Sequence, residues 1–319
     1  MLPQIAEIQR QLEGEHYVTD RAIATTIYLA MNLRKPVLIE GQAGVGKTEI
    51  AKVLSAALHT DLIRLQCYEG LDANTALYEW NYPKQMLHIR LEEAVGENHD
   101  LRKAEAEIFS EPYLLKRPLL NAITREDQAP VLLIDEVDRA DEEFEAFLLE
   151  VLSDFQVTIP ELGTVHAKHR PYVVLTSNRT RELSDALKRR CLYLWIDYPD
   201  FDKEVRIIET KVEGINHLLA EQVAGFMQVV RRIRLSKTPG MAESLDWAMS
   251  LMALHADHLE PEAVTETLGA ILKDRDDVSR LAGARTESIV GELTSLDEAG
   301  LRSAAPQIAQ RIDKELVSR

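Results

Sequence analysis

Short apolar strands alternate with amphipathic helices along the first two thirds of the chain. The strands are predicted from brief apolar runs, and the helices from apolar residues that repeat three or four positions apart. Such alternation indicates a parallel sheet covered by helices on both faces, and a run without polar residues, such as 131–134, is typical of a buried parallel strand. The predicted strands are 36–40, 62–66, 131–134, 172–176 and 192–196, and the predicted helices are 3–13, 20–33, 48–58, 142–153 and 181–187.

The pattern changes after Pro199, beyond which only helices are predicted. Apolar residues at helical spacing indicate helices over 203–212, 218–233, 243–254 and 261–272. We therefore expect three parts in the chain: an α/β domain over residues 1–200, a smaller all-helical domain over 201–283, and a tail or one more helix over 284–319.

Two segments of the first domain depart from the alternation. Residues 156–160 and 164–168 flank a turn that contains Gly163, which predicts a β-hairpin. The segment 69–125 is polar and helical in character and includes the aromatic patch 78–82. Packing of this patch in a core and its contact with a partner remain equally open.

Composition narrows the class of protein. The 319 residues are 45% apolar and 28% charged, which is ordinary for a soluble globular protein. A formal net charge of −16 disfavours nucleic-acid binding, which needs a basic surface. The two cysteines do not indicate a disulfide framework. The sequence shows neither a signal peptide nor an apolar run long enough to span a membrane. We therefore expect a cytoplasmic protein.

Residues Gly41 to Thr48 fit the pattern G-x-x-x-x-G-K-S/T. Glycines allow backbone N–H groups to turn towards phosphates, the lysine reaches the outer phosphates, and the Thr48 hydroxyl ligates Mg²⁺. The predicted strand before this loop and helix after it are the context that a phosphate-binding loop requires. The predicted nucleotide-binding residues are Gly41, Gln42, Ala43, Gly44, Val45, Gly46, Lys47, Thr48 and Glu49.

Asp135 and Glu136 follow the apolar strand 131–134. Parallel sheets bind their ligands at the carboxyl ends of the strands, so the two carboxylates are expected beside the phosphate loop. We predict that Asp135 holds Mg²⁺ and that Glu136 is the general base for the attacking water. Neighbouring residues of an extended strand point in opposite directions, which would give the two carboxylates separate roles. Asp138 and Asp141 are interpreted instead as loop and helix-cap groups.

Three further residues have two readings each. Asn178 ends the strand 172–176, where it either donates to a phosphate and orients the water or only turns the chain. Arg189 and Arg190 follow a predicted helix, where they either interact with the helix dipole or reach a nucleotide on a neighbouring subunit. From the residues alone, the dipole is the better explanation of the two arginines.

The segments GQAGVGKT, VLLIDEVDRA, VVLTSN and ALKRRC occur in this order, and together they resemble the AAA+ ATPases and, within them, the MoxR family. Residues 155–199 are similar to the branch related to CoxD, which is associated with maturation of molybdenum-containing carbon monoxide dehydrogenases. The resemblance covers residues 15–275 and implies a P-loop NTPase fold with a helical lid.

The resemblance also implies roles and partners. Asn178 matches the sensor-1 position, and Arg190, with Arg189 beside it, matches the arginine finger. The segments 69–125 and 157–168 match loops that face the pore or a partner in relatives. A homo-oligomer, usually a hexamer, and a partner with a von Willebrand factor A domain are implied as well. The chain departs from the family at Ala242, where relatives usually carry a lid arginine; Lys237 is a candidate substitute.

These observations predict a Mg²⁺-dependent ATPase that remodels a client protein, with metal-cofactor insertion as one candidate setting. A nucleic-acid remodelling ATPase and a nucleotide-gated scaffold with little turnover are the alternatives. The client, and the preference for ATP over GTP, are not determined by the sequence.

Overall fold

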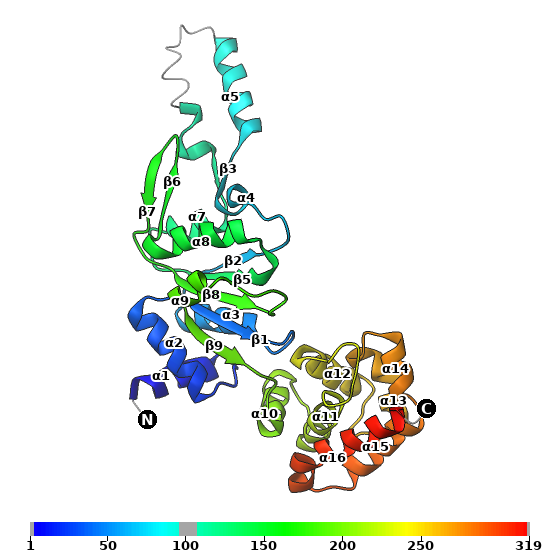
Figure 1. The fold of residues 1–319 in the computed structure, drawn as a ribbon. Coiled ribbons are helices and arrows are strands. Elements are labelled where there is room, and N and C mark those ends of the chain that lie inside the picture. Colours follow the sequence, from blue (N-terminus) through cyan, green and yellow to red (C-terminus); the bar gives the residue numbers. More distant parts are fainter. Residues whose placement is uncertain (1–2, 96–106, 318–319) are drawn as a thin grey trace. The chain divides into compact units, whose positions relative to one another are not determined.

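A five-stranded sheet forms the frame of the α/β part. The computed structural model describes residues 3–95 and 107–317, and the strand order in this sheet is β2-β5-β8-β1-β9 (Figure 1). β2, β5, β8 and β1 pair in parallel, which confirms the predicted fold class. The strands are β1 (Val37–Gly41), β2 (Leu62–Gln66), β5 (Val131–Asp135), β8 (Tyr172–Ser177) and β9 (Leu192–Ile196).

Contacts divide the chain into two compact units. Unit 1 comprises residues up to Gln11, Asp20–Glu40 and Lys47–Trp195, and unit 2 comprises Leu12–Thr19, Gly41–Gly46 and residues from Ile196 onward. Each unit is described separately below.

Helices cover both faces of the unit 1 sheet. One face carries α7 (Pro118–Ile123) and α8 (Glu142–Asp154), whose apolar residues form one core with alternate strand residues such as Leu132 and Leu175. The other face carries α2 (Arg21–Leu33) and α3 (Lys47–Ala57), where Ile27 and Leu54 lie beside Val37 and Val174. Since both faces are covered, β1 and β5 are buried throughout, as their apolar sequence predicts, whereas β2 and β9 at the two edges have exposed residues.

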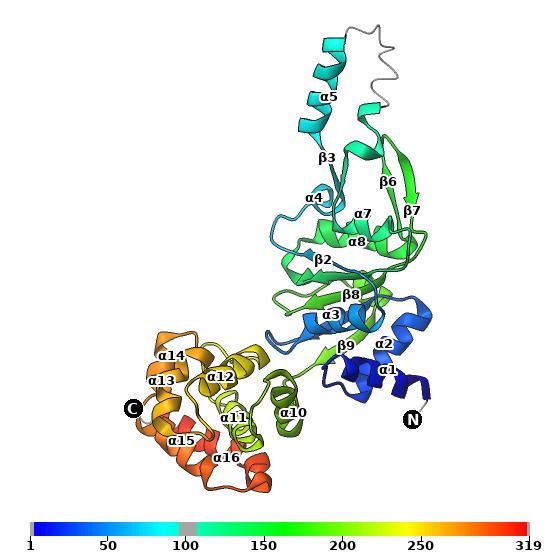
Figure 2. The same cartoon turned by 180° about the vertical axis from the view of Figure 1, so that it is seen from behind.

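The segment 69–125 contains two short strands that the sequence analysis missed. The described elements are α4 (Ala73–Leu77), β3 (Tyr78–Trp80), α5 (Tyr82–Val95), η1 (Glu111–Tyr113), β4 (Leu114–Lys116) and α7; residues 96–106 of the predicted segment lie outside the described chain. β3 and β4 pair antiparallel. Figures 1 and 2 show α5 projecting away from the sheet.

This pairing splits the aromatic patch 78–82. Trp80 is buried and contacts Tyr78 and Phe109 edge to face, whereas Tyr82 is 60% exposed. Core packing is therefore confirmed for Trp80, while Tyr82 lies at the surface and its contact with a partner stays a prediction.

Most predicted element boundaries are within a few residues of the observed ones, and the hairpin of β6 (Gln156–Ile159) and β7 (Gly163–His166) is confirmed. The helix predicted over 181–187 is misplaced, because α9 spans Asp185–Arg190. Ser184 caps α9 by accepting a hydrogen bond from Leu187 N. Arg189 and Arg190 therefore lie in the last turn of this helix instead of following it.

Unit 2 from Ile196 onward is helical, as predicted. Its centre is α11, in which every residue from Leu219 to Val230 is buried. Residues beyond 283 form two helices whose apolar side chains join the same core. No helix in the described parts of the chain is long and apolar enough to cross a membrane. The helices are α10 (Phe201–Lys211), α11 (His217–Val230), α12 (Met241–Ala253), α13 (Pro261–Ile271), α14 (Arg275–Leu281), α15 (Ala284–Thr294) and α16 (Glu298–Val317), and α1 (Pro3–Gly14) lies at the other end of the chain.

Candidate functional site

Asp135 connects several elements at the carboxyl edge of the sheet. Its carboxylate is buried at the end of β5. Oδ1 accepts hydrogen bonds from Thr48 Oγ1 at 3.0 Å and from Thr176 Oγ1 at 2.5 Å, while Oδ2 pairs with Arg64 Nη2 at 2.5 Å. The partners come from α3, β8 and β2, so one carboxylate joins three elements. Charge-assisted hydrogen bonds of this kind make a buried carboxylate tolerable.

The backbone conformation of Glu136 differs from the predicted one. Its backbone is left-handed, with φ 54° and ψ 50°, so the expectation of an extended residue here is wrong. The carboxylate accepts a hydrogen bond from Asn178 Nδ2 at 3.1 Å and a longer one from Gln66 Nε2 at 3.4 Å. A non-glycine residue in this region is uncommon, and such residues gather at functional sites. The left-handed turn, and not strand alternation, separates Glu136 from Asp135.

Lys47 and Thr48 begin α3, where the helix N-terminus favours negative charge. Lys47 is buried, and this burial lowers the pKa of its amine below the ordinary value, while the carboxylates of Asp138, Asp135 and Glu136 act in the opposite direction. Burial is thus the larger effect on the pKa of Lys47, and the nearby carboxylates offset only part of it.

The oxygen atoms beside Lys47 fit a Mg²⁺ ion. Thr48 Oγ1 and Asp135 Oδ1 lie 3.0 Å apart, and hydroxyl and carboxylate oxygens are the ligands that this hard cation prefers. Arg64 now supplies the positive charge at Asp135 Oδ2, and its side chain is 52% exposed. The geometry thus offers an oxygen pair that fits a metal ion, beside an arginine that is half exposed.

The glycine loop is defined by close backbone approaches within unit 2. A Cβ on Gly41 would lie 2.1 Å from Ile196 O, so a side chain cannot fit there. Gly44 has a φ of +77°, and its carbonyl accepts a hydrogen bond from Met241 N at 2.7 Å. The loop is therefore held by backbone of the helical part, at the start of α12.

The departure at Ala242 lies next to this contact. Ala242 is exposed, and Glu243 turns back to accept a hydrogen bond from Gly240 N at 2.9 Å, which caps the helix. Lys237 is also exposed, and its backbone N–H bonds Asp277. A predicted nucleotide contact by Lys237 stays a prediction.

Asp138 positions the turn that carries Asn178. Its side chain accepts hydrogen bonds from Thr180 N at 2.8 Å, Thr180 Oγ1 at 2.7 Å and Asn178 N at 3.2 Å. Asp141 caps α8 by accepting from Phe144 N at 2.8 Å. The interpretation of Asp138 and Asp141 as loop and cap groups is therefore confirmed.

The two arginines of α9 are not bound to this cluster. Both are exposed, and Arg190 donates to Ser153 Oγ at 3.0 Å and to Ala186 O at 3.2 Å, within its own corner of unit 1. The structure brings together Lys47, Thr48, Asp135, Glu136 and Asn178, whereas Arg189 and Arg190 remain surface groups of the single chain.

The remaining predicted residues of the glycine loop differ in their surroundings. Gln42 and Ala43 are exposed, Val45 is buried, Gly46 has a positive φ, and Glu49 pairs with Lys52.

Sequence reasoning missed Arg64, Gln66 and Thr176. Each lies in a predicted strand, at or near its carboxyl end. The rule that strand ends form the ligand site applies to them as well as to Asp135. Only the strand order, which places β2 and β8 on either side of β5, shows that they contact the two carboxylates.

We expect Thr180→Val to destabilise the protein in a pH-dependent way. Burial raises the pKa of Asp138, but the hydrogen bonds from Thr180 and Asn178 outweigh it and lower the pKa below the ordinary value. A carboxyl with a lowered folded-state pKa contributes stability that is present above its unfolded pKa and is lost as the pH falls through the folded one. Losing the Thr180 hydroxyl should therefore cost about 1.5–3 kcal/mol at neutral pH.

Urea unfolding from acidic to neutral pH measures this effect. The difference between Thr180→Val and the unmodified protein should shrink as the pH falls, while Thr158→Val, at an exposed hairpin position, should change little. A difference that is the same at every pH would contradict the role given to Asp138.

Relatives of known sequence cover most of the chain. An uncharacterised protein of Staphylococcus haemolyticus is 25% identical over 250 residues, which span 76% of this chain and 84% of the relative. An uncharacterised protein of Staphylococcus aureus strain USA300 is 26% identical over 250 residues, spanning 75% and 83%. Their names state no activity.

Two solved structures have a partly similar arrangement. The RuvB Holliday junction branch migration motor of Thermotoga maritima is 15% identical with a TM-score of 0.46, covering 95% of this chain and 87% of its own. A putative ATPase from Cytophaga hutchinsonii is 16% identical with a TM-score of 0.46, covering 92% and 93%. Because the TM-scores are below 0.5, these likenesses carry no argument about function.

The family comparison concerns the segment that holds the site. Residues 36–191 match the AAA domain of the dynein-related subfamily, and this range runs from the start of β1 past α9. It contains the glycine loop, both carboxylates, Asn178 and the two arginines. Residues 36–191 are therefore similar to the AAA domain of the dynein-related subfamily, and this similarity supports ATP hydrolase activity.

Proposed function

We propose that the protein is a Mg²⁺-dependent ATPase in which Glu136 is the general base and Asn178 positions its carboxylate. The observation that carries this proposal is the hydrogen bond of 3.1 Å from Asn178 Nδ2 to Glu136 Oε1, next to an Asp135 that is fixed by Thr48 and Thr176. Asp135 is buried at the edge of the sheet, whereas Glu136 is partly exposed and accepts a hydrogen bond from the Asn178 amide.

The two carboxylates have environments suited to different tasks. Asp135 is buried, whereas the Glu136 side chain is 39% exposed, so a water molecule can reach Glu136. A general base must lie within hydrogen-bond reach of the proton that it takes. Thr48 and Asp135 would hold Mg²⁺, which on binding would neutralise charge on the phosphates. Lys47 would contact the outer phosphates, and the N–H groups of Gly41 to Gly46 the remaining oxygens.

We expect Glu136→Gln to bind ATP and to release phosphate at least about 100-fold more slowly, because general-base catalysis contributes roughly 10²–10⁴-fold. Lys47→Ala should instead weaken nucleotide binding itself. Phosphate release and binding of a fluorescent ATP analogue measure the two effects separately. Glu142→Gln, at an exposed position in the first turn of α8, is the matched control. Normal turnover by Glu136→Gln would show that another group is the base.

We further propose that Arg190 acts on the nucleotide of a neighbouring copy in a ring, which by resemblance is a hexamer. Its side chain is exposed and donates hydrogen bonds to Ser153 and Ala186. A guanidinium supplied by another subunit stabilises charge in the transition state and is worth about 10³–10⁵-fold in systems that use one. Arg189, one position earlier, is the second candidate.

Mixing variants tests this arrangement. Arg190→Ala subunits retain Glu136, and Glu136→Gln subunits retain Arg190, so mixed rings should recover part of the activity that each variant alone lacks. Phosphate release should also rise more than linearly with protein concentration. Lys188→Ala, which removes a cation of the same helix that pairs with Glu182, should leave the rate unchanged. Mixtures as inactive as their components would contradict a contribution in trans.

The work done with ATP is proposed by resemblance to the MoxR family and its CoxD-related branch. We propose remodelling of a client protein in the cytoplasm, in connection with enzyme maturation and with a von Willebrand factor A protein as a partner. The net charge of −16 disfavours the nucleic-acid alternative. A pull-down with Glu136→Gln, held in its ATP state, would identify the client. ATP turnover that is absent at every protein concentration would favour the scaffold alternative.

A further inference from the structure

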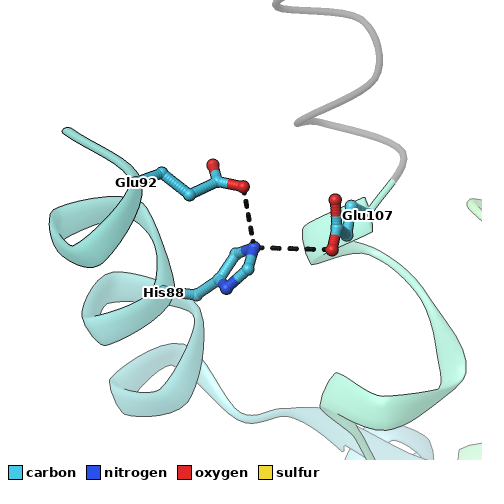
Figure 3. Close-up of side chains that lie close together, drawn as sticks. All are labelled: His88, Glu92 and Glu107. Atoms are coloured by element: carbon cyan, nitrogen blue, oxygen red, sulfur yellow. Dashed lines mark ion pairs between the residues drawn. The ribbon is translucent and has the colours of Figure 1, made fainter. Parts of the chain in front are cut away.

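A histidine and two glutamates converge beside α5, apart from the residues assigned to ATP hydrolysis. His88 and Glu92 lie one turn apart on this helix, and Glu107 lies beyond residues 96–106 in the chain (Figure 3). One ligand atom from each residue lies within 4.8 Å of the other two. We propose that these three side chains bind one divalent transition-metal ion, with Zn²⁺ as the representative.

The separations approach those of ligands that share a metal. His88 Nε2 is 3.1 Å from Glu92 Oε1 and 3.7 Å from Glu107 Oε1. Zinc binds imidazole nitrogen and carboxylate oxygen at about 2.0–2.2 Å, so two such ligands lie roughly 3.0–3.5 Å apart at angles between octahedral and tetrahedral. Small side-chain rotations bring all three atoms onto one ion.

His88 Nε2 is shielded from solvent and is not aligned for a hydrogen bond with either carboxylate. A buried nitrogen without a hydrogen bond is costly, and a metal ion would satisfy its lone pair. Two carboxylates facing one imidazole also leave net negative charge, which a divalent cation balances. The nitrogen ligand favours zinc or a similar transition metal over Mg²⁺ and Ca²⁺, which prefer oxygen alone.

The surrounding contacts hold the two sides of the site together. Gln85 Nε2 donates to Ile108 O at 2.6 Å, and Lys84 Nζ donates to Pro112 O at 2.9 Å, so α5 is fixed to the segment that follows Glu107. The His88 ring also packs at 5.6 Å from the ring of Tyr113. Glu107 is 59% exposed, which leaves a path for an ion from solvent. The ligands are therefore pre-arranged on a fixed scaffold.

Metal titration of the full chain tests the proposal without any use of ATP turnover. Metal-stripped protein, free of nucleotide, is titrated with Zn²⁺ against a chromophoric chelator, and with Co²⁺ while its visible spectrum is recorded. The unmodified protein should bind one equivalent more tightly than His88→Ala does, by more than about 100-fold, because even outer-shell partners of a metal are worth 10–100-fold. The cobalt bands should weaken in parallel.

Two further variants keep the test independent of folding. Glu107→Gln changes one exposed oxygen and should also weaken zinc binding, whereas His166→Ala, at an exposed position of β7, should not. The proposal is overturned if His88→Ala and Glu107→Gln bind zinc as tightly as the unmodified protein, or if the cobalt spectrum is the same in all of them.

Discussion

The buried carboxylate of Asp135 is the constraint on which the arrangement of the active site depends. A charge in this position is tolerable only with close partners, and it has them in Thr48, Thr176 and Arg64. These partners lie on α3, β8 and β2, so satisfying one charge also fixes the start of α3 against two strand ends. Because Glu136 directly follows Asp135, the contacts of Asp135 also fix the position of Glu136.

The negative charge of Asp135 is balanced by a neighbouring cation. The positive charge near Oδ2 comes from Arg64, whose side chain is half exposed. Asp138 has a different task, since three hydrogen bonds from the Asn178–Thr180 turn engage it. The three carboxylates of this region therefore have different partners: Asp135 pairs with Arg64, Glu136 is partly exposed and accepts from Asn178, and Asp138 holds the turn that carries Asn178.

The sequence was sufficient for what depends on local pattern and motif. Apolar strands, the glycine loop and the strand-end carboxylates were predicted, because each has a short-range signal. β3 and β4 were missed because short antiparallel strands far apart in the chain leave no such signal. The left-handed Glu136, and the contacts of Gln66 and Thr176 with this acidic pair, depend on which strands are neighbours. Which strands are neighbours in the sheet is determined by the tertiary fold and has no short-range signal in the sequence.

The Mg²⁺ dependence of ATP binding tests the central role of Asp135 most directly. Affinity for a fluorescent ATP analogue is measured with and without Mg²⁺ for the unmodified protein and for Asp135→Asn, whose amide can still accept from Thr48 and Thr176. The account predicts that Mg²⁺ tightens binding in the unmodified protein and that Asp135→Asn loses this gain while keeping its metal-free affinity. An equal gain in both proteins would contradict the account.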